Sequence, residues 1–131
     1  MTEPASVVRK YFEALSAKDF ATAAGMFADD VRWHQPGGNR FSGTHQGGAA
    51  VGELLAGMIT VSAGSFELTL TGPLMANGTL VAAPIHFTAK REGAVMDQHG
   101  VDVLRVEDGR VAEAWLFSGD AAEEDAFWGA A

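Results

Sequence analysis

The segment Val95–Phe117 constrains the fold of this chain most strongly, because it has the pattern of two long strands joined by a tight turn. Alternating apolar runs lie on both sides of the dipeptide Asp108-Gly109. Asp-Gly is a strong hairpin signal, since both residues tolerate the positive φ angles that the turn requires. The sequence therefore predicts a long β-hairpin centred on this dipeptide.

One residue of the first strand does not fit the apolar pattern. Asp102 lies between Val101 and Val103, and strand alternation places it on the same face as Leu104 and Val106. A carboxylate on an apolar face is either paired or has a raised pKa. The alternative is a solvent-exposed position at the edge of the sheet, because an acid within an apolar pattern does not always mark a functional site.

The other elements are predicted as helices first and strands afterwards. Apolar residues at helical spacing predict helices over residues 4–15, from Phe20 to the pair Asp29-Asp30, and over 49–59. Residues 31–35 predict a short strand, and residues 43–48 a glycine-rich bend. From residue 65 the period changes to two, and turns at 77–78, 91–93 and 108–109 predict a four-stranded meander. A short helix capped by Asp120 closes the chain.

Helices segregated from an antiparallel sheet define an α+β fold. We expect one domain over residues 1–131, with a curved antiparallel sheet wrapped over three N-terminal helices. Such a sheet leaves a cone-shaped cavity, which is a natural site for an apolar ligand.

Composition disfavours several classes of function. The net charge of −8 and the scattered basic residues argue against binding to nucleic acid and to anionic membranes. The chain has no cysteine, which excludes disulfides and thiolate metal sites. His34 and His45 lack the spacing of a metal site, so we expect neither metal nor cofactor. No apolar run reaches spanning length and no signal-peptide pattern is present, which predicts a cytoplasmic protein.

The order of elements and several local motifs resemble the nuclear transport factor 2-like superfamily, which includes ketosteroid isomerases and SnoaL-type polyketide cyclases. The motifs are Tyr11-Phe12-Glu13-Ala14-Leu15, Asp19-Phe20, Met26-Phe27-Ala28-Asp29-Asp30-Val31, Gly43 with Gly47, Asp102-Val103-Leu104-Arg105-Val106, and Val111-Ala112-Glu113-Ala114-Trp115. They cover nearly the whole chain. They indicate the fold rather than the activity, since one fold hosts many chemistries.

The resemblance to ketosteroid isomerases implies three catalytic positions. The oxyanion-hole tyrosine falls on Tyr11, and the second donor, an acid kept protonated in an apolar site, falls on Asp102. That enzyme is a standard example of such an acid. The general base, an Asp before a proline, is replaced here by Gln35 before Pro36. An amide accepts no proton near neutral pH, so the isomerase route lacks its base.

The resemblance to SnoaL-type cyclases implies an aldol closure of a polyketide, with Asp102 as acid and base and no cofactor. The residues predicted to line the pocket are Leu15, Trp33, His34, His86, Trp115 and Phe117. Each aromatic residue is equally compatible with plain core packing. His34 shares a face with Arg32, opposite Trp33, if its strand is regular. His86 is either a core or a pocket residue.

Three functions are compatible with these features. The first is a cofactor-independent enzyme that transfers protons or closes rings on an apolar, oxygenated, polyketide-like or steroid-like molecule. The second is a protein of the same fold that binds such a ligand without turnover, and the third is a dimeric interaction protein. We also expect a homodimer formed through the outer sheet face, with some of Val101, Val103, Leu68 and Leu70 in the interface.

Overall fold

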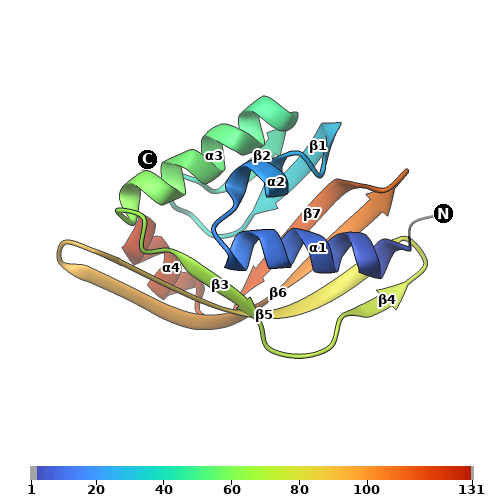
Figure 1. Ribbon diagram of the computed structural model, residues 1–131. Coiled ribbons are helices and arrows are strands. Elements are labelled where there is room, and N and C mark those ends of the chain that lie inside the picture. Colours follow the sequence, from blue (N-terminus) through green and yellow to red (C-terminus); the bar gives the residue numbers. More distant parts are fainter. Residues whose placement is uncertain (1–2, 131) are drawn as a thin grey trace.

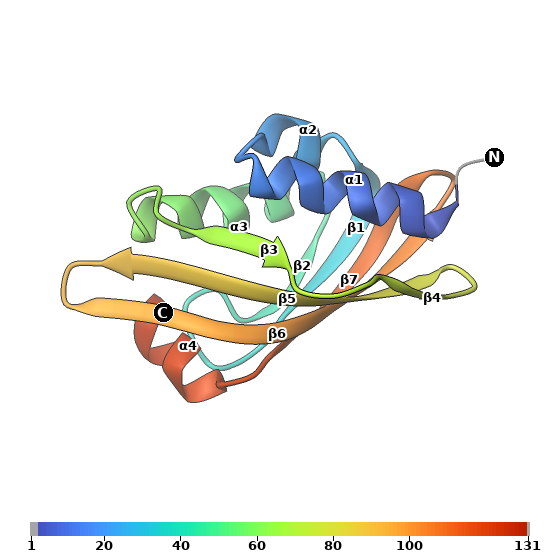
Figure 2. The same ribbon diagram turned by 60° about the horizontal axis from the view of Figure 1, so that its bottom comes forward.

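Three helices gather over one side of a single curved sheet (Figures 1 and 2). The computed structural model describes residues 3–130. The helices are α1 (Pro4–Ser16), α2 (Phe20–Ala24), α3 (Gly48–Val61) and α4 (Ala121–Trp128). The strands are β1 (Phe27–Gln35), β2 (Gly43–Gln46), β3 (Glu67–Leu70), β4 (Met75–Asn77), β5 (Leu80–Arg91), β6 (Ala94–Glu107) and β7 (Arg110–Ser118). The predicted α+β fold is confirmed.

The sheet has the strand order β2-β1-β7-β6-β5-β3, and β4 pairs with one end of β5. All neighbours are antiparallel except β1 and β7, which run parallel. The sheet is therefore mixed, whereas the sequence predicted a purely antiparallel one. The parallel pair joins β1 and β7, which are about 80 residues apart in the chain. No local sequence pattern predicts a pairing between strands so far apart.

Two of the three predicted turns are confirmed at the predicted residues, and the third lies one residue later in the chain. Register pairs Glu107 with Arg110 around Asp108-Gly109, and both turn residues have positive φ, at 51° and 75°. Glu92-Gly93 forms a two-residue turn within the predicted segment 91–93. The turn predicted at Asn77-Gly78 instead contains Gly78 and Thr79, because Asn77 pairs with Leu80. These turns need backbone conformations that only a few residue types adopt readily, which is why the sequence reports them.

Two elements differ from their predictions. The second helix ends at Ala24, and Phe27–Asp30 belong to β1 rather than to the helix. Phe27 pairs with Val111 of β7, so strand pairing across the fold overrides the local helical spacing. The predicted bend over residues 43–48 contains β2, whose four residues pair with the end of β1. In the part of the chain that the structure describes, no helix is long and apolar enough to cross a membrane.

Strand alternation separates an inner sheet face from an outer one. On β6 the buried inner residues are Met96, Gln98, Asp102, Leu104 and Val106. The inner faces of the strands and the apolar stripes of α1 and α3 form one core. Leu68 is part of that core and Leu70 packs against it, so neither lies on the outer face where the predicted dimer interface had placed them.

The C-terminal helix α4 is fixed against the sheet at both ends. Gln98 of β6 accepts a hydrogen bond from the backbone N–H of Asp120 (3.0 Å) and donates one to its carbonyl (3.1 Å). At the other end, Arg91 donates to the carbonyls of Phe127 (2.6 Å) and Ala126 (3.2 Å). These contacts hold the buried face of α4 against the open end of the core.

Candidate functional site

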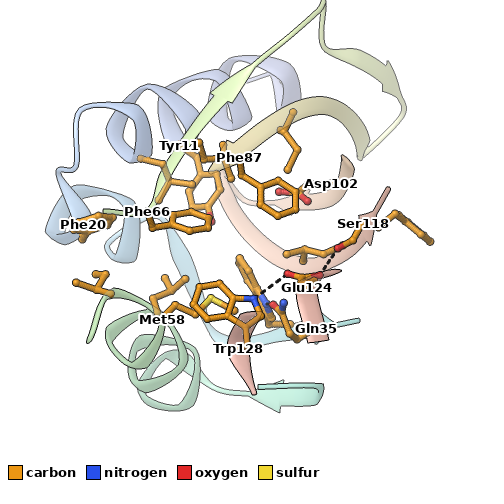
Figure 3. A pocket seen from close by; sticks show the side chains of 18 residues that line it. Tyr11, Phe20, Gln35, Met58, Phe66, Phe87, Asp102, Ser118, Glu124 and Trp128 are labelled. Carbon is orange, nitrogen blue, oxygen red and sulfur yellow. Dashed lines mark hydrogen bonds between the residues drawn. The ribbon is translucent and has the colours of Figure 1, made fainter. Parts of the chain in front are cut away.

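A cavity of about 70 Å³ lies between the inner sheet face and the helices (Figure 3). Most of its wall is apolar, and α3 and β7 contribute three residues each, while α1, β1, β5 and α4 contribute two each. The residues that line it are Tyr11, Leu15, Phe20, Trp33, Gln35, Leu55, Met58, Ile59, Phe66, Leu68, Ile85, Phe87, Asp102, Leu116, Phe117, Ser118, Glu124 and Trp128. The volume is several times what a single water needs, so the cavity has room for part of an organic ligand.

Asp102 reaches the cavity from the middle of β6 (Figure 3). The residue is only 5% exposed, and within residues 3–130 no hydrogen bond to its carboxyl group contributes to its pKa. Burial in this apolar wall, together with the negative charge of Glu124, raises the pKa of Asp102 to about 8. The carboxyl is therefore mostly protonated at neutral pH and can donate a hydrogen bond.

Tyr11 faces the same cavity from the apolar stripe of α1. Its ring packs at the edge of Phe12 and against Phe27, with centroid distances of 5.1 and 5.5 Å. Burial and the nearby charge of Asp102 raise the pKa of the Tyr11 hydroxyl above its usual range, so the group stays a neutral donor. The structure thus brings together the two residues that the resemblance assigns to an oxyanion hole.

Gln35 is the third polar residue from the sequence prediction, and it also lines the cavity. Its side-chain oxygen accepts a hydrogen bond from Nε1 of Trp33 (2.9 Å), on the same face of β1. This contact orients the amide and leaves its NH₂ group as the donor available to a ligand.

Three of the predicted pocket residues lie on the outer sheet face and do not line the cavity. Register pairs Asp102 with Leu116, so the inward residue of β7 is Leu116 and Trp115 points outward. His34 stacks on Trp115 with a centroid distance of 5.6 Å, and its Nε2 lies 2.6 Å from Oε2 of Glu113. These two predictions were wrong because strand alternation, not residue type, decides which face a side chain occupies.

His86 is the third incorrect prediction. Its neighbours Ile85 and Phe87 take the inner face, so the imidazole points outward and its Nε2 lies 2.6 Å from Oδ1 of Asp97. His99 lies beside it on the outer face, as strand alternation predicted. Among the other predicted pocket residues, Leu15 and Trp33 line the wall. Phe117 borders the cavity at its rim, but it pairs with Val101 next to the inward Leu116, so its side chain belongs to the outer face and is 57% exposed.

Glu124 is a site residue that the sequence reasoning missed. It is 5% exposed, lies on α4 and lines the cavity together with Trp128 (Figure 3). Its Oε1 accepts a hydrogen bond from the Ser118 hydroxyl, and its Oε2 accepts one from Nε1 of Trp128 (3.1 Å). Burial raises the pKa of Glu124, and these two hydrogen bonds oppose the rise. The spacing of Glu124, Phe127 and Trp128 places them on one helical face. This spacing is the sequence signal from which the burial of Glu124 could have been predicted.

The polar groups of this cavity are therefore donors and acids. Tyr11, Gln35 and Asp102 can donate to a ligand oxygen, and Glu124 offers a carboxylate. Among residues 3–130, no lysine, arginine or histidine lines the wall. An anionic ligand would thus meet buried acids without a compensating cation, whereas a neutral oxygenated molecule would find donors for its oxygen.

Comparisons with known proteins agree with this architecture. The model of the SnoaL-like domain matches residues 8–114. This chain belongs to the SnoaL-like family. An uncharacterised protein of Mycobacterium tuberculosis is 30% identical over 130 residues, with 98% of this chain and 99% of that protein covered.

Solved structures extend the comparison to the superfamily. A cystatin-like-fold protein of unknown function from Xanthomonas campestris is 42% identical, with a TM-score of 0.93 and coverage of 98% of this chain and 99% of that one. A protein of Kribbella flavida, provisionally named a ketosteroid isomerase, is 26% identical with a TM-score of 0.71 and coverage of 92% and 80%. An NTF2-like protein of Burkholderia xenovorans is 22% identical with a TM-score of 0.70, covers 92% of each chain and shares the fold. The predicted superfamily of this SnoaL-like protein is confirmed.

Proposed function

We propose that this SnoaL-like protein is a cofactor-independent enzyme that transfers protons on a neutral, apolar, oxygenated molecule of polyketide-like or steroid-like character. One observation carries the proposal: Asp102 is a buried, protonated carboxyl, and it shares an apolar cavity with Tyr11. Donors held in an apolar wall stabilise negative charge that develops on a ligand oxygen. Isomerisation and aldol-type ring closure both pass through such a charge.

A flat phenol tests the donor pair directly, because its oxygen mimics an enolate. We expect β-naphthol or a phenolic steroid to bind, and Tyr11→Phe or Asp102→Asn to weaken binding by about 1–3 kcal/mol, or roughly 5- to 150-fold. Isothermal titration calorimetry at pH 7 measures the affinity. The matched control is Asp30→Asn, which changes an exposed acid outside the cavity.

If both cavity variants stay folded and bind the phenol as tightly as the wild-type protein, the oxyanion-hole interpretation is wrong. Binding of phenols without turnover of any ketone would instead favour the second candidate, a ligand-binding protein of the same fold.

We also propose that the protein forms a homodimer through the outer face of β5, β6 and β7. Val101 and Phe117 pair across β6 and β7 and are exposed there, and the next pair on this face, Val103 and Trp115, is half-buried. A contiguous apolar face of this kind is typical of a protein contact. We expect light scattering at micromolar concentration to give twice the chain mass of 13.7 kDa, and Val101→Glu to shift the protein to the monomer. A wild-type monomer under these conditions would exclude this arrangement.

A further inference from the structure

The second buried acid of the cavity, Glu124, has surroundings unlike those of Asp102. Each of its two carboxylate oxygens already accepts one hydrogen bond, from Ser118 and from Trp128. Within residues 3–130, no such hydrogen bond lowers the pKa of Asp102. Hydrogen bonds to a carboxylate favour its charged form. When the two acids of one apolar cavity compete for a proton, Asp102 therefore keeps it and Glu124 carries the charge.

The position of Glu124 is also fixed in advance. Its helix is fixed by Gln98 at the N-terminal end and by Arg91 at the C-terminal end. The indole that donates to Glu124 is itself fully buried and packs edge-on against Phe41 and Phe127. A carboxylate oxygen has two lone pairs, so each oxygen of Glu124 retains one acceptor position for a ligand. A preorganised carboxylate with free acceptor positions meets the geometric requirement for a general base.

We propose that Glu124 is the general base of this site, and that the substrate is a neutral apolar ketone with an acidic hydrogen on the carbon next to its carbonyl group. This inference rests on the proposed function. In it, Glu124 accepts the proton, which the amide of Gln35 cannot do. Glu124 takes the proton as the C–H bond breaks. The electron pair of that bond forms a C=C bond, and the carbonyl π electrons move to the oxygen, where Asp102 and Tyr11 donate hydrogen bonds. Return of the proton from Glu124 completes the cycle without any oxidant or cofactor.

A purely structural role is the competing explanation, since Glu124 also holds Ser118 and Trp128 in place. Exchange of hydrogen for deuterium separates the two. β-Tetralone is a flat, neutral ketone with exchangeable α-hydrogens, and β-naphthol has the shape of its enol but cannot react. The rate of loss of the α-hydrogen NMR signal in heavy water reports proton transfer, and β-naphthol affinity reports the integrity of the cavity.

We expect the wild-type protein to exchange β-tetralone faster than buffer does. Glu124→Gln should slow that exchange by about 10²-fold or more, which is typical for loss of a positioned base, with β-naphthol affinity unchanged within a few-fold. The matched control, Glu53→Gln, makes the same change at an exposed position of α3 and should exchange at the wild-type rate. Glu124→Asp keeps the carboxylate but shortens the side chain by one methylene, which moves the base away from the substrate. The exchange rate of this variant should be at least about tenfold lower than that of the wild-type protein.

Exchange by Glu124→Gln at the wild-type rate overturns the proposal. If that variant does not fold, a wild-type rate in Glu124→Asp overturns it equally. A wild-type protein that binds β-naphthol but does not accelerate exchange also overturns the role of Glu124 and leaves the donor pair intact. Absence of β-naphthol binding would overturn the proposed function itself.

Discussion

Replacing Gln35 by Asp is expected to raise the turnover of a Δ5-ketosteroid by up to about 10²–10⁴-fold over the wild-type protein. The gain is expected because the new base lies on β1, where the isomerase orientation of the substrate requires it, whereas Glu124 lies on α4. Gln35 occupies the position that the resemblance to ketosteroid isomerases assigns to the base, and its side chain is buried on the cavity wall. A carboxylate at this position can accept a proton, which an amide cannot. Nε1 of Trp33, which now donates to Gln35, is placed to orient the new carboxylate.

The formation of the conjugated ketone, followed by its ultraviolet absorbance, measures this gain. Gln46→Asp is the matched control, because it introduces the same carboxylate at an exposed position of β2. The double variant Gln35→Asp with Glu124→Gln should keep the gain, since Asp at position 35 then supplies the base. A folded Gln35→Asp protein with no more activity than the wild type would show that the cavity does not hold a steroid in the isomerase orientation.

The free energy of unfolding is expected to fall as the pH rises from about 4 to about 8, with Asp102 as a main cause. In the unfolded chain this carboxyl ionises near its ordinary pKa of 3.8, whereas in the folded protein it stays protonated until about pH 8. The folded state therefore binds more protons in this window, so stability decreases with increasing pH. One pKa unit corresponds to about 1.4 kcal/mol, which sets an upper limit of about 6 kcal/mol for the loss.

Urea unfolding at pH 5 and at pH 8.5 measures this loss. Asp102→Asn cannot ionise at this position, so its stability should fall much less between the two pH values than that of the wild-type protein. Asp30→Asn, which changes an exposed acid, should follow the wild type. The pKa of Glu124 is also raised and contributes in the same direction in all three proteins. If the free energy of unfolding falls equally with pH in the wild-type protein and in Asp102→Asn, the burial of a protonated Asp102 is contradicted.

The sequence by itself determined the parts of the fold that depend on local backbone preference. Asp108-Gly109 produces a turn because both residues accept positive φ, and Asp120 caps α4 through a hydrogen bond from the backbone N–H of Glu123 (3.0 Å). Alternation along β6 was enough to place Asp102 on one face with Leu104 and Val106 and His99 on the other, and the structure shows that the face of Asp102 is the buried one. Motifs spread along the chain were enough to identify the superfamily.

Only the tertiary structure decided which residues meet in the cavity. Trp115 and His86 are in strands as predicted, but the register between strands turns both of them outward. Phe27–Asp30 joined β1 because β7 offered a strand partner more than 80 residues away. Glu124 entered the site because Gln98 and Arg91 dock a short helix whose own sequence does not report where it packs. Backbone preferences act between neighbours in the chain, whereas the burial that sets the pKa of Asp102 depends on side chains brought together from α1, β6 and α4.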